Sequence, residues 1–131
     1  MINPHPGLPE LEYVKPATLL EASKFLAAHD GMAKPFSGGT DSFVRLRDGI
    51  LKLDYLVDVK GLDGTKELSF DPKKGLTIGA AVTMNRVATH PDVIKYYPNL
   101  VEAITSVASY QLRNRATIIG NICNACIRIV A

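Results

Sequence analysis

Residues 37–41 are Ser37-Gly38-Gly39-Thr40-Asp41, and they join a predicted strand at residues 34–36 to a predicted helical turn at residues 42–47. The two glycines lack Cβ, so the backbone there can turn sharply and come close to a ligand. The amides at the start of the following helix are free to bond phosphate oxygens, and successive amides form an anion-binding nest. The sequence differs from the dinucleotide fingerprint and from the P-loop, since it lacks the third glycine of the first and the lysine of the second. A tight turn in which Asp41 caps the next helix explains these residues equally well.

A second glycine-bearing segment occupies residues 111–121 and reads Gln111-Leu112-Arg113-Asn114-Arg115-Ala116-Thr117-Ile118-Ile119-Gly120-Asn121. Its two guanidinium groups can pair with a phosphate or fix a loop through backbone carbonyls. The hydroxyl of Thr117 and the amides of Gly120 and Asn121 could complete a pocket. Taken alone, the segment is better explained as a basic helix end that interacts with the helix dipole. The two segments together predict a cradle for a phosphorylated cofactor.

Length and composition restrict the class of protein. A chain of 131 residues holds one domain, or one domain and a fragment, and can bury roughly two-thirds of its unfolded surface. Hydrophobic residues make up 47% and charged residues 21%, which is typical of a folded globular protein. The net charge of +2 is too small to indicate nucleic-acid binding. No stretch is long enough for a membrane span and the first residues do not form a leader, so we expect a cytoplasmic protein.

The cysteines and histidines do not indicate a metal or catalytic site. Cys123 and Cys126 form a Cys-x-x-Cys pair, but two thiolates alone do not complete a tetrahedral zinc site. His5, His29 and His90 are scattered without ligand-like spacing. We therefore assign no catalytic residue and no metal ligand.

The chain alternates between helix and strand signals. A capping box at residues 18–21 opens a helix that runs to His29, with Leu19, Ala22 and Phe25 on its inner face. Four strands are expected at residues 32–36, 55–59, 66–70 and 76–80, the last two joined by a hairpin at residues 71–75. Three further helices are expected, two capped by Thr83 and Asp92 and one at residues 99–109. Prolines 4, 6, 9 and 16 predict an extended N-terminal arm.

Four spaced motifs, taken in order, resemble the FAD-binding (medium) subunit of molybdenum hydroxylases. The family includes the flavin subunits or domains of carbon monoxide dehydrogenase, xanthine dehydrogenase and hydroxybenzoyl-CoA reductase. The resemblance covers nearly all of the chain. The motifs are Pro16-x-x-Leu19-x-Glu21-Ala22, residues 37–41, Leu76-Thr77-Ile78-Gly79-Ala80 followed by Thr83, and Gln111-x-Arg113-Asn114-x-Ala116-Thr117-Ile118-x-Gly120-Asn121.

The resemblance implies an α+β fold, the small lobe of the vanillyl-alcohol-oxidase-type (PCMH-type) FAD-binding fold plus the start of its second lobe. Residues 1–60 would form the N-terminal α/β lobe with the glycine-rich pyrophosphate loop, and residues 61–131 the start of the second FAD-binding lobe, incomplete at the C-terminus. The expected FAD-binding residues are Ser37, Gly38, Gly39, Thr40, Asp41, Thr117, Gly120 and Asn121.

The resemblance also implies a function. The chain would be an FAD-binding electron-transfer component of a molybdenum-containing hydroxylase or dehydrogenase, and would pass electrons from iron-sulfur clusters through flavin to an acceptor. Its partners would be a molybdopterin-containing large subunit and an iron-sulfur small subunit. The alternative is a non-catalytic nucleotide-binding module or a degenerate interaction fragment.

Two departures from the family pattern modify these expectations. Ile119 stands where the family has the first glycine of a Gly-Gly pair, and a β-branched residue resists φ > 0 and adds bulk near the cofactor, so we expect weaker binding. After Ala125 the chain leaves the family pattern and reads like a truncated copy. We therefore expect the isolated chain to be inactive, to bind FAD weakly, and to form a homo-oligomer through exposed apolar surface.

Overall fold

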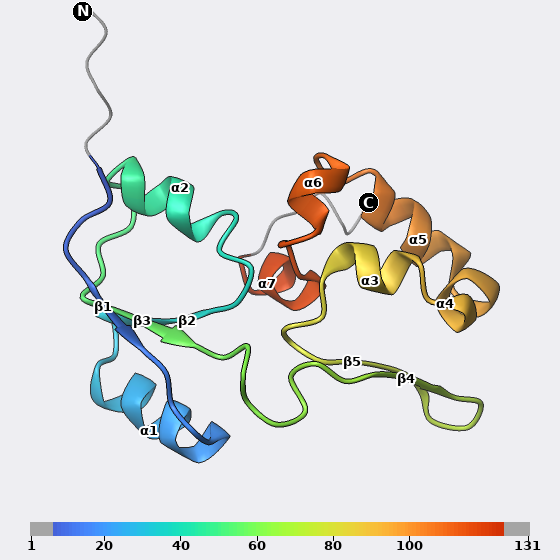
Figure 1. Cartoon of the computed structure of the whole chain (residues 1–131), viewed down its shortest axis with the longest axis horizontal. Helices are drawn as coiled ribbons and strands as arrows, with labels where there is room; N and C mark the ends of the chain where they lie inside the picture. The colour runs from blue at the N-terminus through green and yellow to red at the C-terminus, as the bar shows by residue number, and fades with distance from the viewer. Residues whose placement is uncertain (1–6, 125–131) are drawn as a thin grey trace, which may run out of the picture.

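The structure of the protein is a computed structural model that describes residues 7–124. Its strands form two separate sheets (Figure 1). The first sheet has three parallel strands in the order β1-β3-β2. The second is an antiparallel hairpin of β4 and β5. The strands are β1 (Glu12–Val14), β2 (Ala33–Phe36), β3 (Tyr55–Asp58), β4 (Leu68–Asp71) and β5 (Gly75–Ile78). Among residues 7–124, no helix combines the length and the apolar character needed to cross a lipid bilayer. His5 and Cys126 lie outside the described residues.

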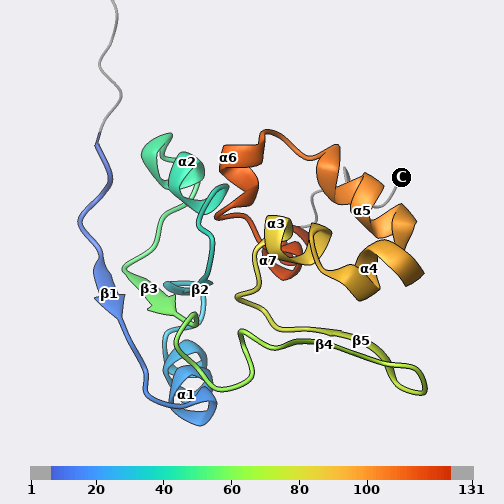
Figure 2. The same ribbon diagram turned by 45° about the vertical axis from the view of Figure 1, so that its right-hand side comes forward.

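The three-stranded sheet lies between two helices, α1 (Leu19–Ala28) and α2 (Ser42–Arg47), in both views of the molecule (Figures 1 and 2). Alternate residues of a strand point to opposite faces, so β3 contributes to two apolar clusters. Leu56 packs with Phe36 and with Leu46 of α2. Its neighbour Val57 packs on the other face with Ala22 of α1. Both β3 side chains are almost completely buried.

The start of α1 confirms half of the predicted capping box. The Thr18 hydroxyl accepts a hydrogen bond from the amide of Glu21 at 3.1 Å. The Glu21 carboxylate accepts at 2.8 Å from the amide of Ala17 rather than from that of Thr18. The prediction that Leu19 faces inward was wrong, because it is 58% exposed while Ala22 is buried. Leu19 is the first residue of α1.

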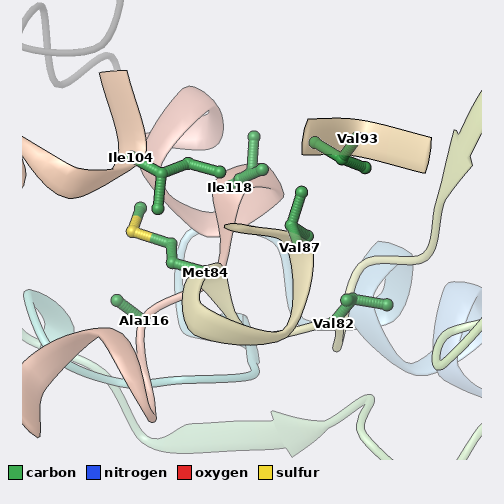
Figure 3. Packing of buried hydrophobic residues seen from close by; sticks show 7 residues of the cluster. All are labelled: Val82, Met84, Val87, Val93, Ile104, Ala116 and Ile118. Atoms are coloured by element: carbon green, nitrogen blue, oxygen red, sulfur yellow. The ribbon is translucent and has the colours of Figure 1, made fainter. Parts of the chain in front are cut away.

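Five helices follow the hairpin in the described part of the chain, and four of them contribute side chains to the largest apolar cluster (Figure 3). They are α3 (Met84–Ala88), α4 (Pro91–Tyr96), α5 (Pro98–Thr105), α6 (Tyr110–Arg113) and α7 (Ile118–Cys123). In Figure 3 the side chains of Val87 and Val93 face each other from α3 and α4. The buried members are Val82, Met84, Val87, Val93, Ile104, Ala116 and Ile118. Leu68, Leu76 and Ile78 of the hairpin pack against this cluster.

Several predicted boundaries differ from the structure. The proline-containing N-terminal arm was predicted to be extended, and the structure shows that its residues Glu12–Val14 form the strand β1. His90, and not Asp92, is the N-cap residue of α4, since Pro91 occupies the first helical position. The helix expected at residues 99–109 ends at Thr105, and a short helix α6 begins at Tyr110. The predicted α+β class is confirmed.

Candidate functional site

Both glycine-bearing segments line one cavity of about 440 Å³. The loop between β2 and α2, here called the glycine loop (residues 37–41), forms one side of the cavity. The start of α7 forms another side. All eight residues expected from the sequence to bind the nucleotide lie on this cavity: Ser37, Gly38, Gly39, Thr40, Asp41, Thr117, Gly120 and Asn121.

Direct contacts hold the glycine loop against the second half of the chain. Gly38 lies against the backbone of Arg115, and an added Cβ would overlap the Arg115 carbonyl oxygen. The Ser37 hydroxyl donates to the carbonyl of Ala80 at 3.3 Å. At the other end of the loop, the side-chain amide of Asn124 donates to the Asp41 carboxylate at 3.3 Å. The loop is therefore fixed by the residues that follow β5 and that surround α7.

Gly39 is required by its conformation and by its neighbours. Its φ of +72° lies in the left-handed region that residues with a Cβ rarely adopt. An added Cβ would also overlap the ring of Phe36, the last residue of β2. That ring packs edge-on against Phe43, with ring centroids 5.2 Å apart, and the Lys60 ammonium lies 4.4 Å from its centroid. The rings of Phe36 and Phe43 thus leave no room for a side chain at residue 39.

The glycine loop, which lines the cavity, contains backbone amides without a protein acceptor among residues 7–124. Within residues 7–124, the amides of Gly38, Gly39, Thr40 and Asp41 donate to no protein acceptor. Gly38, Gly39 and Thr40 are half-buried and Asp41 is exposed, so water can satisfy these amides, and a ligand in the cavity could replace that water. Successive amides of this kind favour an anion.

The second segment begins a helix instead of forming the free turn that the sequence suggested. Thr117 is the N-cap of α7, and its hydroxyl accepts from the amide of Gly120 at 3.0 Å. Ile119 does not need φ > 0, because it lies in the first turn of this helix. The expected backbone strain at Ile119 was therefore wrong, although its side chain does line the cavity. The side-chain oxygen of Asn121 is buried and has no hydrogen-bond partner among the described residues.

Arg113 fixes a loop through the Nη1 and Nε atoms of its guanidinium group. Its Nη1 donates to the carbonyls of Thr105, Val107 and Ala108, and its Nε donates to the side chain of Asn85 at 3.3 Å. This selects one of the two uses of arginine that the sequence left open. No sequence signal identified Asn85, because a single asparagine in a helix is common.

The sequence also gave no sign of the apolar part of the cavity. Val107, Ala108 and Leu112 contribute to it because the break between α5 and α6 places them there. Cys123, which we expected to be incidental, is exposed at the end of α7 and also lines the cavity. A cavity with a polar backbone side and an apolar side is typical of a nucleotide-sized ligand.

Comparison with known proteins identifies the family of the chain. Residues 9–128 match the family described as "FAD binding domain in molybdopterin dehydrogenase". A putative xanthine dehydrogenase FAD-binding subunit from Escherichia coli (strain K12) is 35% identical over 112 residues, which are 86% of this chain and 38% of that protein. The structure of quinoline 2-oxidoreductase from Pseudomonas putida 86 superposes with a TM-score of 0.80 at 32% identity, over 88% of this chain and 40% of that one. Carbon monoxide dehydrogenase from Hydrogenophaga pseudoflava superposes with a TM-score of 0.81 at 28% identity, over 87% and 39% of the respective chains. The chain thus spans less than half the length of the proteins it matches.

Proposed function

The chain belongs to the family of FAD-binding domains in molybdopterin dehydrogenases, and we propose that it binds the diphosphate and adjoining part of FAD in the cavity between the glycine loop and α7. In this proposal Ser37, Gly38, Gly39, Thr40 and Asp41 hold the diphosphate mainly through backbone amides. Thr117, Gly120 and Asn121 border the same region from α7. No residue of the chain is assigned a catalytic role.

One observation carries the proposal, and it is the run of free amides from Gly38 to Asp41 on the cavity. A diphosphate removed from water needs several charge-assisted hydrogen bonds, each contributing about 1.5–3 kcal/mol. Backbone amides supply them without the entropy cost of ordering long side chains. The unpartnered side-chain oxygen of Asn121 adds an acceptor that fits a hydroxyl or N–H of the same ligand.

The charged side chains that line the cavity balance, so binding of an anion would depend on hydrogen-bond donors. Asp41 brings the one carboxylate that lines the cavity among residues 7–124, and Asn124 donates a hydrogen bond to it. Lys34 brings a positive charge to the same lining. Thr40 and Ser42 add hydroxyl groups to this lining. The donor set therefore fits the group that the family binds.

We further propose that the chain is part of the FAD-binding electron-transfer component of a molybdenum-containing hydroxylase or dehydrogenase. Bound FAD would supply the redox chemistry, accepting electrons and passing them on, while the protein provides binding and orientation. The relatives are named as subunits or medium chains, which supports a multi-subunit enzyme. The partners would be a molybdopterin-containing large subunit and an iron-sulfur small subunit, with electrons passing from the clusters through flavin to an acceptor. Self-association through exposed apolar side chains stays a prediction.

A competition experiment tests the binding proposal. FAD is equilibrated with the purified chain by dialysis, ADP or riboflavin is added as competitor, and the FAD that stays bound is quantified by chromatography. We expect ADP to displace FAD because it carries the diphosphate, and riboflavin to displace little. Displacement by riboflavin and not by ADP would contradict the assignment of the glycine loop.

A matched pair of variants tests the amides themselves. Asp41 has a φ of −90°, which a modest backbone shift brings to the value of about −65° that proline requires, and its amide donates no hydrogen bond within residues 7–124. Asp41→Pro removes the side chain and the amide, whereas Asp41→Ala removes the side chain alone. We expect ADP to bind Asp41→Pro about tenfold more weakly than Asp41→Ala. Equal affinities would show that this amide does not contact the diphosphate.

A further inference from the structure

A short stretch between α5 and α6 forms one side of the cavity, and its backbone is held in an unusual conformation. This stretch, here called the cavity wall, consists of Ser106, Val107 and Ala108. Ala108 has a φ of +44°, in the left-handed region, and is the one described residue other than glycine with a positive φ. A residue with a Cβ enters this region only at an energetic cost, so surrounding contacts must hold it there.

Arg113 supplies those contacts from α6. Its Nη1 lies 3.1 Å from the Thr105 carbonyl oxygen, 2.7 Å from that of Val107 and 3.4 Å from that of Ala108. Three carbonyls around the end of α5 thus converge on one guanidinium group. The carbonyls at a helix C-terminus lack partners within the helix, and a cation satisfies them well.

Asn85 holds Arg113 in place from α3. Its side-chain oxygen accepts from Nε of Arg113, and its amide donates to the carbonyl of Tyr110 and to the side-chain oxygen of Asn114, both at 2.8 Å. A backbone carbonyl can only accept, which fixes the orientation of the Asn85 amide. Asn85 is 8% exposed and sits between Met84 and Arg86 on a helix whose inner face is in the core.

We propose that Asn85 and Arg113 form a positioning clamp, which sets the place of the cavity wall relative to the glycine loop and thereby tunes cofactor affinity. The inference rests on the proposed function, in that FAD is taken to occupy this cavity. Neither side chain lines the cavity. Both residues act through the wall: Arg113 holds its carbonyls, and Asn85 anchors Arg113 to the rigid core.

The test compares Arg113→Lys with Arg86→Lys in the same chain. Lysine keeps the charge but lacks the planar fork that reaches the carbonyls and Asn85 together. Arg86 is the matched control, because it contacts a single carbonyl, that of Lys66, away from the cavity wall. We expect FAD to bind Arg113→Lys about tenfold more weakly than wild type and Arg86→Lys with nearly unchanged affinity. We also expect faster hydrogen exchange at residues 105–109 in Arg113→Lys alone.

A rescue variant separates positioning from general destabilisation. Glycine adopts the left-handed conformation without the cost that alanine pays, so Ala108→Gly should restore part of the lost FAD affinity in the Arg113→Lys background. Urea unfolding of both variants separates the two cases, because a purely structural loss at Arg113 requires affinity and the free energy of unfolding to recover together. Unchanged FAD affinity in Arg113→Lys, or a double variant that binds no better than the single one, would overturn the proposal.

Failure of the proposed function gives a different result. Wild type would then not bind FAD, and hydrogen exchange at residues 105–109 would be the remaining test of whether Arg113 holds the cavity wall. Faster exchange at residues 105–109 in Arg113→Lys would still support the hold of Arg113 on the wall. Unchanged exchange would overturn it.

Discussion

Gly38 packs directly against the carbonyl group of Arg115, so that no side-chain carbon fits between the two backbones. This contact brings the glycine loop beside the start of α7, and the two together line the cavity. The requirement for glycine at this position thus arises from another part of the protein and not from the turn itself, since Gly38 does not have a positive φ.

Gly38→Ala should separate the two segments. The added methyl group would push against the Arg115 carbonyl, and we expect the free energy of unfolding to fall by about 1–3 kcal/mol, together with weaker FAD binding. Urea unfolding measures the first and flavin fluorescence the second. Gly61→Ala is the control, because nothing lies near a Cβ at that position, and it should change stability by less than about 0.5 kcal/mol. A neutral Gly38→Ala would disprove the close contact.

Gly39→Ala should be more harmful than the same change at Gly31. Both glycines have positive φ, at +72° and +77°, so each alanine variant incurs a conformational cost of about 1–2 kcal/mol. A Cβ at residue 31 meets no neighbour, whereas one at residue 39 overlaps the Phe36 ring. The difference between the losses of unfolding free energy in the two variants therefore measures the cost of the overlap between a Cβ at residue 39 and the Phe36 ring. Equal losses would mean that the ring moves aside freely.

Ile119→Gly should change stability and affinity in opposite directions. Glycine inside α7 costs about 1 kcal/mol in helix propensity, but removal of the side chain enlarges the cavity, so we expect weaker folding and tighter FAD binding. Ile122→Gly is the control, since Ile122 lies in the same helix, is 59% exposed and does not line the cavity. It should lose stability without gaining affinity. Reduced FAD affinity in Ile119→Gly would show that this side chain contacts the ligand favourably.

Asp58 should contribute to the loss of stability in acid. Burial raises the pKa of this carboxyl, but hydrogen bonds from Lys60 and Tyr13 outweigh it and lower the pKa below 3.8. Because the folded-state pKa lies below the unfolded one, the stabilisation is present above pH 3.8 and is lost as the pH falls through the folded value.

Asp58→Asn should therefore flatten the acid limb of the stability curve. Urea unfolding between about pH 2 and 6 measures the slope. Asp63→Asn is the control, because Asp63 is exposed, and it should leave the slope as in wild type. Parallel curves for Asp58→Asn and wild type would show that the hydrogen bonds to Asp58 do not stabilise its charged form.

Local signals in the sequence were sufficient where a few neighbouring residues decide the structure. The helix opened by Thr18 begins at Leu19, as predicted, because the cap needs only the residues of its own first turn. The hairpin was also confirmed, since Asp71 accepts hydrogen bonds from the amides of Lys73 and Lys74 and Gly75 has a positive φ. The ordered motifs correctly indicated the family, and the eight assigned residues do share one cavity.

The features that depend on distant contacts were missed. β1 exists because β3 pairs with it, and nothing in the arm itself indicates that partner. Ala108 takes a left-handed conformation that its sequence does not favour, because Arg113 holds the surrounding carbonyls. That conformation lies between α5 and α6, where Val107 and Ala108 contribute to the apolar side of the cavity. Asn85 gave no signal because its role depends on residues more than twenty positions away.

The cavity is also where the two halves of the molecule are joined. Within residues 7–124, the apolar clusters around the three-stranded sheet share no residue with the large cluster of α3, α4, α5 and α7. Contacts of Ser37 with Ala80, of Gly38 with Arg115 and of Asp41 with Asn124 connect the halves at the rim. A molecule seated there touches both halves at once and adds cohesion that neither core provides. Substitutions at Ser37, Gly38 or Asp41 would therefore alter both the binding of a ligand and the contact between the two halves.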